Sequence, residues 1–160
     1  MKRLKLVAGA AALMLLGVSC FVVAAQDGPR LETLVISSKN GQHRFEVEIA
    51  ATPVALEIGL MLREKMEENH GMLFQLGRTD VTRFWMKNTL IPLDMLFIAP
   101  DGTIKKIHGS AAPKSLESIS SEVPVSAVLE INGGRSLALG IAAGDKVVHP
   151  YFENADADTP

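Results

Sequence analysis

The chain has 160 residues, a formal net charge of −2 and a hydrophobic fraction of 48%. This length is typical of one domain, and the composition is that of an ordinary globular protein. The slight acidity argues against nucleic-acid binding, which requires a basic surface. A single cysteine, Cys20, excludes an internal disulfide framework.

Residues 1–25 have the pattern of an export signal. Three cations precede an uncharged apolar run over residues 6–23, and Val23-Ala24-Ala25 supplies the small residues that signal peptidase reads. We therefore expect cleavage after Ala25 and a soluble periplasmic protein. Two alternatives stay open. The run is long enough to remain as a membrane anchor, and Cys20 could carry a lipid, although no leucine lies three residues before it.

Cleavage would change the charge balance of the chain. Removal of residues 1–25 takes away three of the 16 Lys and Arg residues and none of the 18 Asp and Glu residues. The mature chain then has 13 cations and 18 anions, a net charge of −5. Cys20 would also be lost, and with it any thiol nucleophile or thiolate metal ligand.

The first elements of the expected domain are a hairpin and a helix. Two strands are predicted over 34–38 and 43–50, and Asn40-Gly41 between them is typical of a type I′ turn. Thr52 then suits a helix N-cap, followed by proline in the first turn. Apolar residues at helical spacing predict that this helix runs from Pro53 to Arg63.

Beyond Gly71 the pattern changes to the alternation that is typical of strands. Pro100-Asp101-Gly102 predicts a second hairpin, and a helical turn is expected over 135–139. We expect one domain over 26–150 and a disordered acidic tail over 151–160. The fold class is mainly β with one principal helix (α+β), arranged as a compact β-sandwich or small barrel. The further predicted strands cover residues 72–74, 83–87, 93–99, 103–108, 125–131 and 146–149.

A series of distinctive blocks follows in one order along the chain. They are Gly59-Leu60-Met61 with Arg63, residues 71–74, 84–89 and 91–94, Pro113, Ser121, Pro124, residues 128–130, and Gly140-Ile141 with Gly144-Asp145. Together these blocks resemble the family known as domain of unknown function 192. The resemblance covers residues 45–148 and implies a compact β-sandwich-like fold and frequent export. It brings no substrate, cofactor or catalytic residue. Asn132-Gly133-Gly134 departs from the alanine-glycine or proline-glycine turn of the family, which affects the shape of a loop.

The segment 83–87 holds the only tryptophan of the chain and is the first candidate site. In a strand, Arg83, Trp85 and Lys87 would share one face. Two cations beside an indole ring could form cation–π contacts and a platform for a sugar ring or an anionic group. The plainer alternative is a half-buried tryptophan that covers the sheet, with both cations solvated.

Two carboxylates are further candidates. Asp94 follows a proline turn and enters an apolar strand, so it must be paired with Lys87, Arg63 or Arg83, bonded to turn amides, or shifted in pKa. Glu130 lies on the polar side of the strand 125–131, where a solvated or salt-bridged carboxylate is the simplest interpretation. Together, the two could act as the acid and base of glycoside cleavage, provided that they lie about 5–9.5 Å apart.

Other catalytic patterns are missing from the sequence. The four histidines are dispersed without metal-ligand spacing, and no serine has a nucleophile-elbow context. We therefore expect neither a metal nor a cofactor.

Three hypotheses about function remain. The favoured hypothesis is a periplasmic binding or accessory module with a small-molecule or carbohydrate site. The second is a small hydrolase or lyase that acts on envelope carbohydrate through Asp94 and Glu130. The third is a structural partner of another envelope protein, which would present an exposed apolar patch. The ligand site of the favoured hypothesis consists of Arg63, Trp85, Lys87, Asn88 and Asp94.

Overall fold

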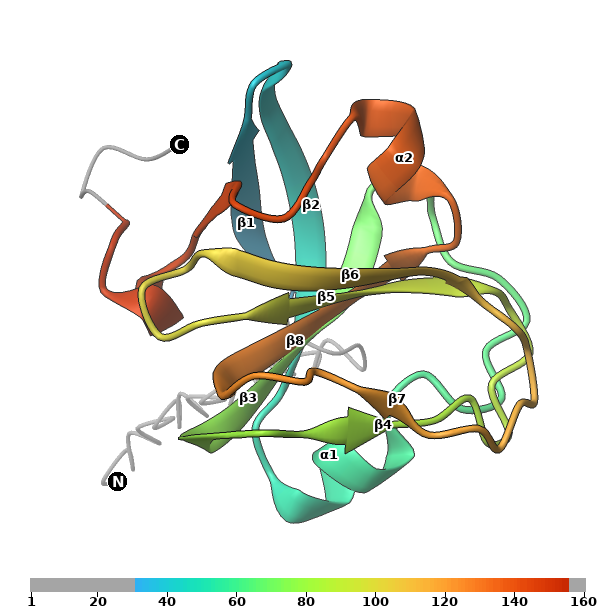
Figure 1. Ribbon diagram of the computed structural model, residues 1–160. Coiled ribbons are helices and arrows are strands. Elements are labelled where there is room, and N and C mark those ends of the chain that lie inside the picture. Colours follow the sequence, from blue (N-terminus) through green and yellow to red (C-terminus); the bar gives the residue numbers. More distant parts are fainter. Residues whose placement is uncertain (1–30, 156–160) are drawn as a thin grey trace, which may run out of the picture.

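The computed structural model describes residues 31–155, and one seven-stranded sheet dominates them (Figure 1). Its strand order is β6-β5-β8-β3-β2-β1-β9, with β2 and β3 parallel and the other neighbours antiparallel. The strands are β1 (Leu31–Ser38), β2 (Gly41–Ala50), β3 (His70–Asp80), β5 (Leu93–Ile98), β6 (Ile104–Ala111), β8 (Val125–Asn132) and β9 (Lys146–Val148).

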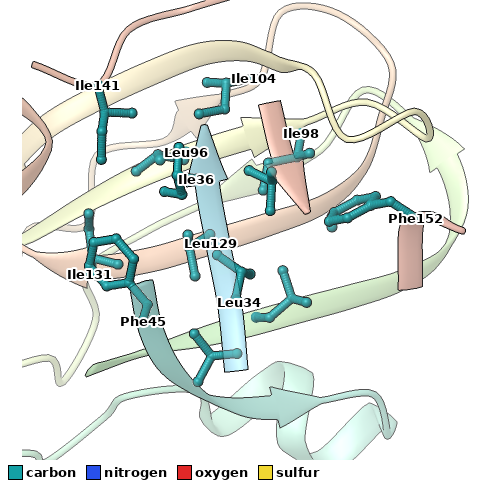
Figure 2. Packing of buried hydrophobic residues seen from close by; sticks show 14 residues of the cluster. Leu34, Ile36, Phe45, Leu96, Ile98, Ile104, Leu129, Ile131, Ile141 and Phe152 are labelled. Carbon is teal, nitrogen blue, oxygen red and sulfur yellow. The ribbon is translucent and has the colours of Figure 1, made fainter. Parts of the chain in front are cut away.

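The sheet curls into a half-barrel whose two outer strands meet. Thr103, next to β6, forms an isolated bridge with Lys146 of β9, and the amide of Ile104 donates to the carbonyl of Asp145 at 2.9 Å. The concave side holds a tightly packed cluster that includes Leu34, Phe45 and Leu129, each fully buried (Figure 2). This interior is the principal hydrophobic core, because apolar side chains from all seven strands converge there.

A second core lies on the convex side of the same sheet. It is covered by α1 (Pro53–Ile58) and by a two-stranded sheet of β4 (Arg83–Phe84) and β7 (Ile119–Ser120), which lie on one side of the main sheet in Figure 1. Both faces of β8 are therefore buried, which explains why seven of its eight residues are inaccessible. The remaining elements are α2 (Arg135–Leu139) and a short 3₁₀ turn over Pro150–Phe152.

Both predicted hairpins are confirmed, with one difference in turn type. β1 pairs with β2 around Lys39-Asn40, and β5 pairs with β6 around residues 99–103. Asn40 does not adopt a positive φ, so the first turn is not type I′. Gly41 carries the left-handed conformation instead, at φ 120°, a region in which glycine has no side-chain clash.

The principal helix is shorter than predicted and ends at Ile58 rather than Arg63. Thr52 caps its start as expected, accepting a hydrogen bond from the amide of Ala55 at 3.2 Å. Gly59 ends it at φ 48°, where an added Cβ would lie 2.9 Å from the Phe74 ring. Apolar residues therefore continue at helical spacing beyond Ile58, but the close packing of Gly59 against Phe74 ends the helix there. No helix within residues 31–155 is long and apolar enough to cross a bilayer.

Two boundaries also differ from expectation. The strand predicted over 83–87 is regular only at Arg83–Phe84, because its partner β7 is two residues long. The domain also continues past residue 150, since Phe152 is buried in the principal core and Asn154 donates to the carbonyl of Val147 at 2.8 Å. Tyr151 and Phe152 thus belong to the domain rather than to an acidic tail. The expected signal segment lies outside the described residues.

Candidate functional site

A cavity of about 290 Å³ opens on the convex side of the sheet, between α1 and the segment that contains Trp85. One wall is formed by residues 56–61 of α1 and the following turn, and the opposite wall by residues 83–87. Phe74 of β3 and Glu130 of β8 also line it. Residues distant in sequence therefore converge on one hollow, which is lined by apolar and polar side chains in similar measure.

Glu130 is the most unusual residue of this cavity. Its side chain is only 4% exposed, and its neighbours across the sheet are Met72 on β3 and Met95 on β5. Within residues 31–155 the carboxyl group has neither a hydrogen-bond donor nor a cation to stabilise its ionised form, and burial raises its pKa to about 8. An uncharged carboxylic acid is thus present at neutral pH, with one O–H donor and free acceptor capacity.

The wall that contains Trp85 is held in place by hydrogen bonds of the backbone. The amide of Met86 donates to the carbonyl of Ser115 at 3.0 Å, and the amide of Lys114 donates to the carbonyl of Thr89 at 3.0 Å. Met86 is fully buried beneath this wall, and Thr89 is also buried and lines the cavity. The wall is therefore preorganised by its own packing.

The rim of the cavity is cationic and aromatic. Arg83, Trp85 and Lys87 all line the hollow, as expected for residues that share one face. The Lys87 ammonium lies 5.0 Å from the centroid of the Trp85 ring, a cation–π contact, and Trp85 is 50% exposed. Phe84 also lines the cavity and packs edge-on against Phe74, with ring centroids 5.1 Å apart.

Asp94 has a different environment, on the opposite face of the sheet. It is fully buried and accepts four hydrogen bonds: from the amides of Ser110 and Gly134, each at 2.7 Å, and from the amide and hydroxyl of Ser136, at 2.8 and 2.5 Å. These donors come from β6 and from the start of α2, so the carboxylate joins three segments. This is the turn-amide alternative, and the expected cation partners do not contact it.

The pairing of Asp94 with Glu130 as acid and base is wrong. Asp94 is directly opposite Ile131 of β8, whose side chain points into the principal core, whereas Glu130 is opposite Met95, which belongs to the second core. Adjacent residues of a strand point to opposite faces. A whole layer of sheet therefore separates the two carboxyl groups, and no single substrate can contact both in the manner of a glycosidase.

Two other predicted ligand residues also lie away from the cavity. Arg63 binds Glu48 through both guanidinium nitrogens, at 2.5 and 2.6 Å, and this pairing raises the pKa of Arg63. It borders a separate hollow with Glu32 and Glu48. Asn88 turns outward at φ 58°, and its carbonyl accepts from the amide of Leu62. Of the five predicted ligand residues, only Trp85 and Lys87 line the cavity.

The helix wall was missed by sequence reasoning. Glu57 and Leu60 line the cavity because α1 and the turn after it lie opposite β4. The two segments are about 25 residues apart in the sequence, so no local pattern predicts that they meet. Val54 and Ile58 of α1 and Leu62 beyond its end are exposed at 65%, 53% and 72%. Exposed apolar side chains, which the structural-partner hypothesis requires, are therefore present near the cavity.

Comparison with known proteins identifies relatives but no activity. The model of the DUF192 family, described as "Uncharacterized ACR", matches residues 35–149. No curated protein matches the chain.

Two solved structures are similar to this chain. A candidate transcription regulator from Sinorhizobium meliloti 1021 is 43% identical, with a TM-score of 0.76 over 79% of this chain and 99% of that chain. A protein of unknown function from Novosphingobium aromaticivorans DSM 12444 is 36% identical, with a TM-score of 0.75 over 78% of this chain and 89% of that chain.

Proposed function

We propose that this chain, which belongs to the uncharacterised DUF192 family, is an exported binding module. Its ligand occupies the cavity beneath Trp85. The observation that carries the proposal is Glu130, a buried carboxyl group without a partner among residues 31–155 that lines an open hollow. Buried polar groups are otherwise almost always hydrogen-bonded.

The fold alone gives no reason for a carboxyl group at this position. Glu130 lies among methionine and leucine side chains, where an apolar residue of similar size would be more stable by several kcal/mol on general grounds. A ligand that hydrogen-bonds to Glu130 would remove this cost. The remaining walls supply apolar contact from the helix side and from the aromatic rings, and Glu57, Arg83, Lys87 and Thr89 add polar groups. The cavity thus combines the apolar surface and the polar groups that orient a ligand in small-molecule sites.

One relative is described as a transcription regulator, but the charges of this chain do not favour binding to a nucleic acid. With 13 Lys and Arg against 18 Asp and Glu after residue 25, the domain lacks the cationic excess that phosphate backbones require. A small ligand fits the cavity better than a nucleic acid.

A ligand screen monitored at Trp85 tests the binding function. Trp85 is the only tryptophan, so its fluorescence reports directly on the rim of the cavity. Residues 26–160 are screened against envelope sugars, metal ions and small anions by fluorescence and thermal shift. We expect at least one compound to change both signals in the wild-type protein and neither in Glu130→Leu. A compound that acts equally on both proteins binds elsewhere, and if all active compounds behave so, the proposal is refuted.

Export is proposed on the pattern of residues 1–25, and mass spectrometry of the protein from its cells tests it. The expected mature chain is soluble and begins at Gln26. A chain that keeps Met1, or one that carries a lipid on Cys20, contradicts this part of the proposal.

A further inference from the structure

The cations on the rim of the cavity are available to a ligand. Neither Arg83 nor Lys87 forms an ion pair with any residue in 31–155, whereas Arg63 and Arg135 are both paired with glutamates. Glu57 is the other charged residue of the lining, apart from Glu130 on the floor. Two cations against one carboxylate favour an anionic group at the rim, because charge-assisted hydrogen bonds are the strongest contacts available there.

The floor of the cavity favours an uncharged group. An amine that reached Glu130 would form an ion pair at a buried position, at a high cost of desolvation, in a cavity that Arg83 and Lys87 also line. A hydroxyl or carbonyl oxygen has no such cost, since a carboxylic acid both donates and accepts hydrogen bonds. The hydroxyl of Thr89, also buried in the lining, donates to the carbonyl of Lys87 at 3.4 Å and retains its oxygen as an acceptor.

The size of the cavity limits the ligand further. Its volume of about 290 Å³ lies at the lower end of the range for ligand sites, so a single ring or a short chain fits. The half-exposed Trp85 ring offers a flat apolar surface at the edge of the cavity.

We propose that the cavity binds a small hydroxylated organic anion, such as a single sugar acid, with its anionic group at Arg83 and Lys87 and an uncharged oxygen at the Glu130 carboxyl. This inference rests on the proposed binding function and specifies the chemistry of its ligand.

Three sugars that differ mainly in charge test the inference. D-Glucuronate, D-glucose and D-glucosamine are titrated against residues 26–160 at neutral pH, with Trp85 fluorescence as the signal. We expect glucuronate to bind at least about tenfold more tightly than glucose, and glucosamine more weakly than glucose. Equal binding of glucuronate and glucose, or tighter binding of glucosamine, overturns the inference.

Matched variants locate the anionic group. The double variant Arg83→Gln/Lys87→Gln is expected to bind glucuronate no better than glucose. The control Arg44→Gln/Lys105→Gln removes two exposed cations that do not line the cavity, and it should keep the wild-type preference. Glu130→Gln retains a donor and an acceptor and should bind glucuronate within about threefold of wild type, while Glu130→Leu should lose at least about tenfold. A preference that survives Arg83→Gln/Lys87→Gln refutes the assignment.

Failure of this inference differs from failure of the binding function. If glucuronate is inactive but another compound from the screen changes Trp85 fluorescence only when Glu130 is present, the binding function stands and the ligand class is wrong. If no compound does so, both are wrong.

Discussion

Two buried carboxylates on opposite faces of the same sheet have opposite surroundings. Asp94 accepts four hydrogen bonds from two other segments of the chain and has no access to solvent. Glu130 accepts none from residues 31–155, and it lines an open cavity. The comparison teaches that burial of a charge does not by itself mark a functional site. The informative quantity is the number of polar partners that the fold supplies.

The largest expected effect comes from disrupting the Asp94 network. Asp94→Asn places an amide NH₂ among N–H and O–H donors, so at least one donor loses its acceptor. We expect a loss of about 3–5 kcal/mol in the free energy of unfolding, measured by denaturant titration at neutral pH. Asp80→Asn, at an exposed carboxylate, should change stability by no more than about 0.5 kcal/mol. An unchanged midpoint for Asp94→Asn would move this residue to the functional candidates.

Glu130 should make the folded state less stable as the pH rises. Burial raises its pKa from 4.5 to about 8, so the folded chain binds more protons than the unfolded chain between these values. Stability gained from the neutral acid is therefore lost as the pH rises from about 4.5 to 8, at up to about 1.4 kcal/mol per pH unit.

Comparison with Glu130→Gln isolates this contribution from the other titrating groups. Denaturant unfolding of both proteins at a series of pH values should show that the variant becomes progressively more stable relative to wild type toward pH 8, by up to about 4 kcal/mol in total. Parallel curves would mean that the pKa of Glu130 is not raised in the folded chain.

The smallest expected effect concerns the rim of the cavity. Lys87 is exposed, and its ammonium group lies over the half-exposed Trp85 ring. Lys87→Gln should therefore lower the free energy of unfolding by less than about 0.5 kcal/mol. Thermal unfolding of the unliganded protein measures this. A larger loss would mean that Lys87 supports the fold, and it would weaken its assignment to a ligand.

Much of the fold follows from local sequence patterns. Asn40-Gly41 and residues 100–102 predicted two hairpins, and Gly140 correctly ends the short helix over 135–139. These features depend on turn chemistry within a few residues. Helix α1 was predicted too long because the close approach of Gly59 to Phe74 depends on tertiary packing.

The candidate site was predictable only in part, because it also depends on tertiary packing. Alternation along β8 correctly separates Glu130 from the residues of the principal core, but it indicates a solvated face. That face is covered by α1, β4 and β7, which lie far away in sequence. The separation of Asp94 from Glu130 likewise depends on the register between β5 and β8, which requires strand pairing and not periodicity alone.

The bridge between Thr103 and Lys146 has a consequence for association of the protein with itself. Open sheets present unpaired backbone groups at their two outer strands, and these groups are templates for aggregation. Here the start of β6 and the short β9 satisfy one another, through hydrogen bonds from Ile104 to Asp145 and from Val147 to Gly102. The half-barrel thereby shields part of both of its own edges, so two copies of the chain have less unpaired backbone through which these edges could join.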